Sequence, residues 1–329
     1  MFEYVVYGLA VRCDVVLRQL ERLEVPADIG GYPRVGLRLK PSKYKRVRAS
    51  NWFHVYTASD GRPVLQLAKV AGGYLLSFPE LADFLVSNDG REVTCCWPYA
   101  HGSTETINHL ALDQVLPCVA NQLGLLALHA TAVVAEHSVC AFVGTAGTGK
   151  STLAASFALA GYPTFCDDCL VVVESGSGVL AEPGYPGVRL WKESAQSLLG
   201  DRVGDHPAVG HYTNKRGVEQ PGEAKAFPRA PTPLVAIYLL TRDVSPAGDS
   251  ASYEIPKIEQ LSAREGFAQL LRSTYRLDTT DTAMLSREFR ALHSLIGRVP
   301  IRRLVIPSDF DQLPVVREIV LADLARIGN

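Results

Sequence analysis

Residues 138–151 read SVCAFVGTAGTGKS, and this stretch decides the fold. Its last eight residues match G-x-x-x-x-G-K-[ST], in which glycines let backbone N–H groups turn toward phosphate oxygens at the start of a helix. A β-rich run, 139–143, comes directly before the loop, and an Ala- and Leu-rich run, 150–160, contains its end and continues beyond it. Strand, glycine-rich loop and helix in this order predict a phosphate-binding loop in an α/β domain.

Each position of this loop has a predicted task. Lys150 is expected to reach the β- and γ-phosphates of ATP, and the Ser151 hydroxyl to bind Mg²⁺. The predicted nucleotide-binding residues are Gly144, Thr145, Ala146, Gly147, Thr148, Gly149, Lys150, Ser151 and Thr152. A glycine-rich turn with a stray lysine is the alternative, and the flanking strand and helix patterns argue against it.

The rest of the chain divides by pattern into two predicted domains, as its 329 residues lead us to expect. Residues 1–117 hold strand-like runs at 3–11, 52–57, 63–70 and 73–78 between turn-rich stretches, which predicts a smaller β-rich or α+β domain. Residues 118–329 alternate strand, loop and helix patterns, with a late strand predicted at 301–306, which predicts an α/β P-loop domain. Within it, residues 201–229 are rich in Gly, Pro, Lys and Arg and are expected to form a polar loop.

The bulk properties exclude several classes of protein. Thirty-three basic and thirty-four acidic residues leave a formal charge of −1, so no overall attraction to nucleic acid is expected. The apolar runs are too short for a membrane span, and Glu3 stands where a signal peptide would carry a basic residue, so we expect a cytoplasmic protein. Seven cysteines without regular spacing favour reduced thiols over a disulfide framework.

Three further residues are candidates for chemistry. Asp167 and Asp168 follow Lys150 by seventeen and eighteen residues, at the end of the next predicted strand. Carboxylates bind Mg²⁺ and accept the proton of an attacking hydroxyl, although an ordinary acidic turn would look the same. His129 is predicted on a strand beside the loop strand. A histidine in an apolar segment is more often structural than catalytic.

These positions together resemble the catalytic core of the bacterial HPr kinase/phosphorylase family. The resemblance rests on LHATAV at 128–133, on the loop at 144–151, and on GYP at 161–163 leading to the acidic pair. It is specific from about residue 120 to 174 and looser beyond. The chain looks closest to the branch associated with lasso-peptide biosynthesis, whose members phosphorylate a serine of a ribosomally synthesised precursor peptide.

The resemblance implies a fold and a set of roles. The second domain would be similar to the C-terminal kinase domain of that family, with MgATP as phosphoryl donor and a precursor peptide as partner. Lys150 would clamp phosphate, Asp167 would be the general base, and Asp168 would serve metal binding or positioning beside Ser151. His129 would orient phosphate or acceptor. Thr152 stands where HPr kinases have glutamate, which weakens the case for HPr itself as substrate.

Four basic residues are weighed as contacts for phosphate or acceptor. They are Lys215, Arg216, Arg189 and Arg276. For each of them, the alternative to a functional contact is a structural role in a solvated loop or an ion pair. Two other functions stay open, namely a kinase of a small hydroxylated metabolite such as free serine and a non-catalytic ATP-binding regulatory module. Assembly into a homo-oligomer is also left open.

Overall fold

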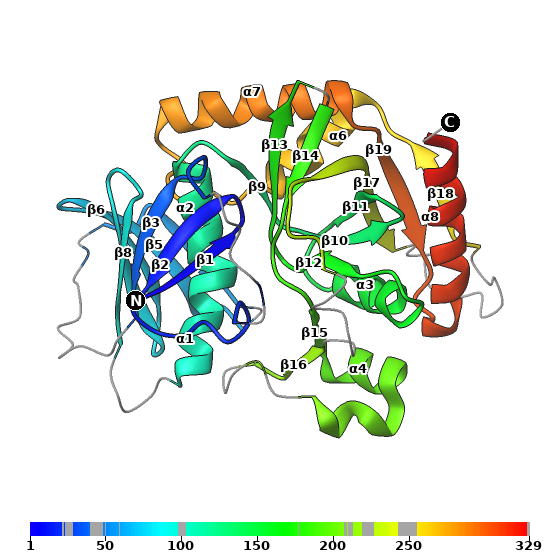
Figure 1. The fold of residues 1–329 in the computed structure, drawn as a ribbon, viewed down its shortest axis with the longest axis horizontal. Coiled ribbons are helices and arrows are strands. Elements are labelled where there is room, and N and C mark those ends of the chain that lie inside the picture. Colours follow the sequence, from blue (N-terminus) through cyan, green and yellow to red (C-terminus); the bar gives the residue numbers. More distant parts are fainter. Residues whose placement is uncertain are drawn as a thin grey trace. The chain divides into compact units, whose positions relative to one another are not determined.

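The structure of the chain is a computed structural model, shown in Figure 1. It describes residues 1–21, 23, 29–39, 49, 51–58, 60–97, 103–176, 178–206, 209, 213–218, 227–242 and 255–327. The chain forms two compact units, each discontinuous in sequence. The first comprises 1–127, 209–214 and 275–289, and the second comprises 128–208, 215–274 and 290–329. The segments 209–214 and 275–289 therefore belong with the N-terminal unit, which a division at residue 117 does not anticipate.

The first unit is built on an eight-stranded sheet in the order β1-β2-β3-β8-β7-β6-β5-β4. Its strands are β1 (Phe2–Val6), β2 (Leu9–Cys13), β3 (Arg34–Arg38), β4 (His54–Thr57), β5 (Pro63–Val70), β6 (Gly73–Phe78), β7 (Ala82–Ser87) and β8 (Glu92–Cys96). The predicted strands at 63–70 and 73–78 are confirmed. The run predicted from residue 3 to 11 is instead a hairpin, because Tyr7 and Gly8 both take positive φ, at 56° and 68°, and form its two-residue turn.

A helical segment completes this unit. It consists of α1 (Thr104–Leu110), the π-helical turn η1 (Ala111–Val115) and α2 (Leu116–Gln122). The side chain of Gln122 donates to the backbone carbonyls of Ser87 and Asn88, which ties the end of α2 to the end of β7. The sequence pattern predicts a helix over 110–126, whereas the segment begins earlier, because Ser103 caps it by accepting from the Thr106 N–H.

The second unit contains a nine-stranded sheet in the order β12-β10-β11-β17-β14-β13-β9, with β19 pairing with β17 and β18. Its strands are β9 (Leu126–Leu128), β10 (Ala130–Ala135), β11 (Ser138–Val143), β12 (Thr164–Cys166), β13 (Leu170–Ser175), β14 (Gly178–Glu182), β17 (Thr232–Arg242), β18 (Lys257–Gln260) and β19 (Ile301–Ile306). Strands β11, β17 and β19 run parallel. Because β11 leads into the loop, the loop lies at their carboxyl-terminal edge.

Helices and one small hairpin accompany this sheet. The helices are α3 (Lys150–Leu159), α4 (Lys192–Leu199), η2 (Gly200–Asp205), α6 (Ala263–Arg272), η3 (Phe310–Gln312) and α8 (Leu313–Ile327). Helix α7 (Thr282–Arg298) begins in the first unit and belongs to the second from residue 290. Strands β15 (Val188–Trp191) and β16 (Lys215–Val218) pair separately. The region predicted as a polar loop therefore contains a helical turn and a strand. The residues of β15 that pair with β16 lie 24 to 30 positions earlier in the chain, so local composition does not reveal this strand.

The core of the second unit fixes the loop strand. Phe142 of β11 lies 5.7 Å from Phe157 of α3 and 6.0 Å from Tyr238 of β17, measured between ring centroids. Burial of one such side chain contributes about 1.5–3 kcal/mol. Helix α8 joins the same cluster, and Arg317 on α8 donates to the Ser156 carbonyl of α3. Figure 1 shows α8 running alongside β19. The strand and helix that hold the loop are thus packed from several elements.

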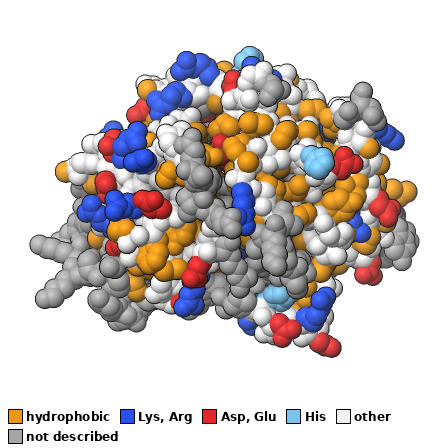
Figure 2. Space-filling view, in the orientation of Figure 1, with side chains coloured by type: hydrophobic (Ala, Val, Ile, Leu, Met, Phe, Trp, Pro, Cys, Tyr) orange, Lys and Arg blue, Asp and Glu red, His pale blue; other side chains and the backbone are white. Residues whose placement is uncertain are grey.

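The surface and the cysteines agree with the composition. On the face drawn in Figure 2, Lys and Arg side chains lie interspersed with Asp and Glu. All seven cysteines are free thiols. Across the described ranges, no helix combines the length and apolar character needed to cross a bilayer.

Candidate active site

The loop from Gly144 to Gly149 has a backbone that only glycine tolerates at its key points. Gly147 and Gly149 take φ values of 81° and 102°. A Cβ on Gly144 would lie 2.7 Å from Thr148 Oγ1 and 3.2 Å from the Leu240 carbonyl oxygen, so a side chain has no room there. Gly149 precedes α3 and offers no side-chain cap. The first amides of α3 are therefore available to an anion.

Lys150 lies folded against this loop. Its ammonium Nζ donates to the Gly144 carbonyl at 2.8 Å and to the Thr145 carbonyl at 3.3 Å. The residue is only 5% exposed. Burial lowers the pKa of Lys150, and the nearby carboxylates of Asp168 and Asp167 oppose that shift. The positive charge is thus held where the loop amides converge, as phosphate binding requires.

Asp167 is the carboxylate in contact with the loop helix. Its Oδ1 accepts from Ser151 Oγ at 2.8 Å and from Thr131 Oγ1 at 2.7 Å, and its Oδ2 accepts from the Arg189 backbone N–H at 2.8 Å. Three elements, β10, α3 and β15, therefore orient one carboxylate. Asp167 is 2% exposed, and its side chain is fully buried. The sequence does not predict a site role for Thr131, because that role depends on the pairing of β10 with β12.

Asp168 serves a different set of partners. Its φ is 66°, a left-handed conformation that costs about 1–2 kcal/mol but that Asp adopts more readily than most residues. Its Oδ2 lies 3.5 Å from Arg189 Nε and 3.9 Å from Lys215 Nζ. Burial alone would raise the pKa of Asp168, but the charges of Arg189 and Lys215 outweigh it and hold the pKa well below the ordinary value.

His129 lies in the break between β9 and β10 and contacts the acidic pair through the backbone. Its Nδ1 is 3.0 Å from the Asp168 carbonyl oxygen. Because a carbonyl only accepts, Nδ1 carries the proton of this hydrogen bond. Burial lowers the pKa of His129, which favours the neutral ring. The backbone N–H of His129 donates to the Ser273 carbonyl. His129 therefore positions the turn that holds both aspartates.

Arg189 and Lys215 supply positive charge beside the aspartates. Arg189 is buried, its Nη2 donates to the Asp167 carbonyl at 2.9 Å, and its guanidinium lies over the Tyr185 ring. Lys215 Nζ lies 5.4 Å above the Trp191 ring, which is 51% exposed. The half-buried Lys215 and the exposed ring of Trp191 thus form a cation–π pair beside Asp168.

The other basic candidates contact different partners. Arg216, the neighbour of Lys215 on β16, donates to the His206 carbonyl at 3.0 Å. Adjacent residues of a strand point to opposite faces, which explains why only Lys215 reaches Asp168. Arg276 belongs to the first unit, where it forms an ion pair with Glu288. Thr152 Oγ1 lies 3.2 Å from Ser194 Oγ on α4.

Ser151 and Asp167 fit the donor chemistry of Mg²⁺. A hydroxyl and a carboxylate that already share a hydrogen bond are oxygen ligands of the kind this ion prefers. Among the residues that the structure describes, no group of three or more His, Cys, Asp or Glu is arranged to hold a metal. Mg²⁺ commonly takes one or two protein ligands, with water and phosphate completing its shell. The residues present therefore suit Mg²⁺ delivered with a nucleotide.

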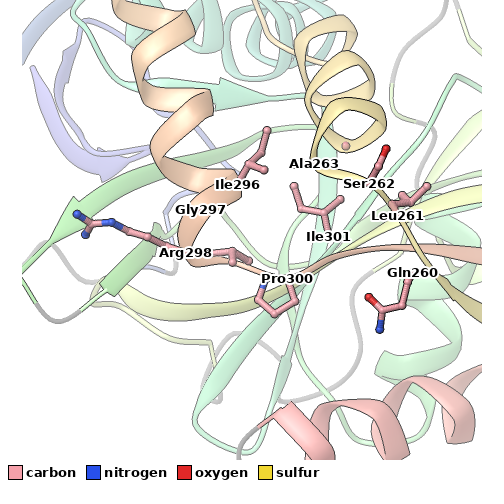
Figure 3. Close-up of a pocket in the computed structure, with 11 residues that line it drawn as sticks. Gln260, Leu261, Ser262, Ala263, Ile296, Gly297, Arg298, Pro300 and Ile301 are labelled. Atoms are coloured by element: carbon pink, nitrogen blue, oxygen red, sulfur yellow. The ribbon is translucent and has the colours of Figure 1, made fainter.

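A pocket of about 350 Å³ elsewhere in the second unit is not this site. It lies between the start of α6, the end of α7 and the start of β19. Figure 3 shows Ile296 and Ile301 facing it, with Arg298 pointing away. The loop follows the carboxyl ends of strands parallel to β19, so the pocket is at the opposite edge of the sheet. The residues with candidate chemistry therefore lie at the loop edge of the sheet, away from this pocket.

Comparison with known proteins gives a likeness to solved structures but no match in sequence. Against protein-family models and against curated proteins, the sequence finds no match. Among solved structures, the chain is similar to the Hpr(Ser) kinase/phosphatase from Coxiella burnetii. The likeness covers 62% of this chain and 99% of that chain, with 10% sequence identity and a TM-score of 0.31. What this site does is therefore inferred from its own residues.

Proposed function

We propose that the protein is an ATP-dependent kinase that transfers the γ-phosphoryl group to a serine hydroxyl of a ribosomally synthesised precursor peptide. The observation that supports it most is the contact of Asp167 with Ser151, which brings a carboxylate against a complete phosphate-binding loop. A loop alone would support nucleotide binding. A carboxylate oriented at the loop helix adds the group that a hydroxyl acceptor needs.

The residues divide the work of transfer between them. The loop amides and Lys150 bind the phosphates of ATP and stabilise the charge that develops on them. Mg²⁺, held by Ser151 with Asp167 or Asp168 nearby, would neutralise part of that charge. Asp167 accepts the proton as the acceptor oxygen bonds to phosphorus and the bond to the ADP oxygen breaks. Since the transition state of such transfers is loose, positioning matters more than base strength.

The choice of a peptide acceptor rests on the family resemblance together with the exposed ring of Trp191 and the ammonium of Lys215 beside Asp168. An aromatic ring on β15 and a cation on its partner strand β16 can contact an extended peptide. The same residues would also serve a small hydroxylated metabolite, so free serine remains the second candidate acceptor. The Asp167 carboxylate would also hold Mg²⁺ in a protein that only senses ATP, so phosphoryl transfer is what distinguishes the two functions.

The test is transfer of radiolabelled phosphate from MgATP. The acceptors are a precursor peptide encoded beside the gene, the same peptide with its serines replaced by alanine, and free serine. We expect label on the serine-containing peptide alone. Label on free serine would identify a metabolite kinase instead, and nucleotide binding without label on any acceptor would favour the regulatory module.

A further inference from the structure

Arg242 stands at the end of β17, beside the phosphate-binding loop. In the ladder between the two strands, Val143 of β11 pairs with Leu239 of β17. Strand β11 then ends in the loop, whereas β17 continues to Arg242. The carbonyl of Leu240 lies close to Gly144, so this extension of β17 borders the loop. Arg242 is the last side chain along that border.

The guanidinium of Arg242 lies over the final glycine of the loop. A Cβ built on Gly149 would be 3.9 Å from Arg242 Nη2 and 3.4 Å from Ile306 Cδ1. Arg242 and Ile306 are ladder partners on β17 and β19, so two strands fix this arrangement. Gly149 immediately precedes the open amides of α3. The guanidinium is therefore placed at the positive end of the loop helix.

The charge of Arg242 distinguishes it from other arginines of this unit. Arg189, Arg302 and Arg303 each have acidic partners. Arg242 is exposed, and within the described ranges no Asp or Glu pairs with it. A cation with no acidic partner among the described residues, placed beside converging N–H groups and Lys150, gains from an anion between them. A guanidinium binds phosphate oxygens through two parallel hydrogen bonds.

We propose that Arg242 is a phosphate-binding residue of the nucleotide site, an inference that rests on the proposed function. In the sheet order, β17 lies on one side of β11, and β10 and β12 lie on the other. Asp167 follows β12, so Arg242 and Asp167 approach the loop from opposite sides. Arg242 therefore binds the polyphosphate away from the acceptor, and its contribution is to nucleotide affinity.

The experiment measures binding of MgATP by calorimetry and its displacement by inorganic triphosphate. The variants are Arg242→Ala, Arg242→Lys and, as matched control, Arg264→Ala. Arg264 is another exposed arginine of the same unit, on the first turn of α6 at the opposite edge of the sheet. We expect Arg242→Ala to weaken the binding of both MgATP and triphosphate about 10- to 100-fold. The affinity of Arg242→Lys should lie between those of the wild type and the alanine variant, since lysine keeps the charge but cannot form the two parallel hydrogen bonds of a guanidinium.

The outcomes separate this inference from the proposed function. If wild type binds MgATP and both Arg242 variants bind it equally well, the inference is wrong and the proposed function stands. Weaker binding of MgATP with unchanged binding of triphosphate would assign Arg242 to the base or ribose and overturn the phosphate contact. If inorganic triphosphate does not displace MgATP from the wild-type protein, the phosphate contact of Arg242 is also overturned. Absence of MgATP binding by wild type would overturn both proposals. If Arg242→Ala does not unfold cooperatively on heating and is therefore misfolded, the affinity of Arg242→Lys decides whether the inference holds.

Discussion

Ser151 Oγ donates a 2.8 Å hydrogen bond to Asp167 Oδ1, although the two residues come from different elements. Ser151 lies in the first turn of α3, and Asp167 follows β12. The same oxygen of Asp167 accepts from Thr131, so its orientation is fixed before any ligand arrives. This contact joins the residues that would bind phosphate and Mg²⁺ to the one that would take the acceptor proton.

Asp167→Asn should abolish phosphoryl transfer while MgATP still binds. The amide keeps the shape of the carboxylate but cannot accept a proton, and loss of a general base typically costs about 10²–10⁴-fold in rate. Rate is measured with labelled ATP, and binding by calorimetry on the same preparation. Asp201→Asn, an exposed aspartate of the same unit, is the control and should be unaffected. Full transfer by Asp167→Asn would remove the base assignment.

Lys150→Ala should abolish MgATP-dependent transfer and weaken nucleotide binding. The variant removes a buried ammonium that lies across the loop and bonds to Gly144 and Thr145. A hydrogen bond to a charged partner contributes about 1.5–3 kcal/mol, so binding should weaken about 10- to 100-fold. Equilibrium binding of a fluorescent ATP analogue measures the loss. Unchanged affinity would show that the ammonium does not touch the phosphates.

Gly144→Ala should damage the loop with little effect on the rest of the fold. The new Cβ would meet Thr148 Oγ1 at 2.7 Å and the Leu240 carbonyl at 3.2 Å, so the loop must move. Overpacking of this kind costs about 1–3 kcal/mol. We expect MgATP affinity to fall about tenfold or more. Gly176→Ala, in the turn between β13 and β14, has open space around its Cβ and should bind like wild type. Equal affinities for the two variants would argue against a phosphate-binding loop at Gly144.

Glu182 should make stability fall as pH rises through the neutral range. Burial raises the pKa of this carboxyl to about 7, and Oε2 has no hydrogen-bond partner among the described residues. Between the ordinary pKa near 4.5 and about 7, the folded state keeps a proton that the unfolded state has released. The free energy of unfolding therefore decreases with pH across that window, by up to about 3 kcal/mol.

Glu182→Gln should remove this slope, because the amide does not titrate. Urea unfolding at pH 5 and pH 8 measures it in both proteins. The wild type is expected to lose more stability than the variant between the two pH values. Parallel behaviour of the two proteins would mean that the Glu182 carboxyl is not held in its neutral form.

The sequence by itself determined the loop, its strand and its helix. Their signals are local, since residues 139–143 are continuously apolar, the glycines stand where positive φ is needed, and α3 begins at Lys150 as predicted. The strand at 301–306 was also predicted, although Arg302 and Arg303 interrupt its apolar residues and its first half is only half-buried. The acidic pair was found from its spacing to the loop.

Only the tertiary structure decided which side chains meet. Lys215 and Arg216 are neighbours with similar chemistry, yet one reaches Asp168 and the other bonds to His206, because β16 pairs with β15. Thr131 and Arg242 have no signal in the sequence that separates them from other strand residues. Their places depend on the pairing of β10 and β17 with strands distant along the chain, and strand pairing is set by packing that local residues do not encode.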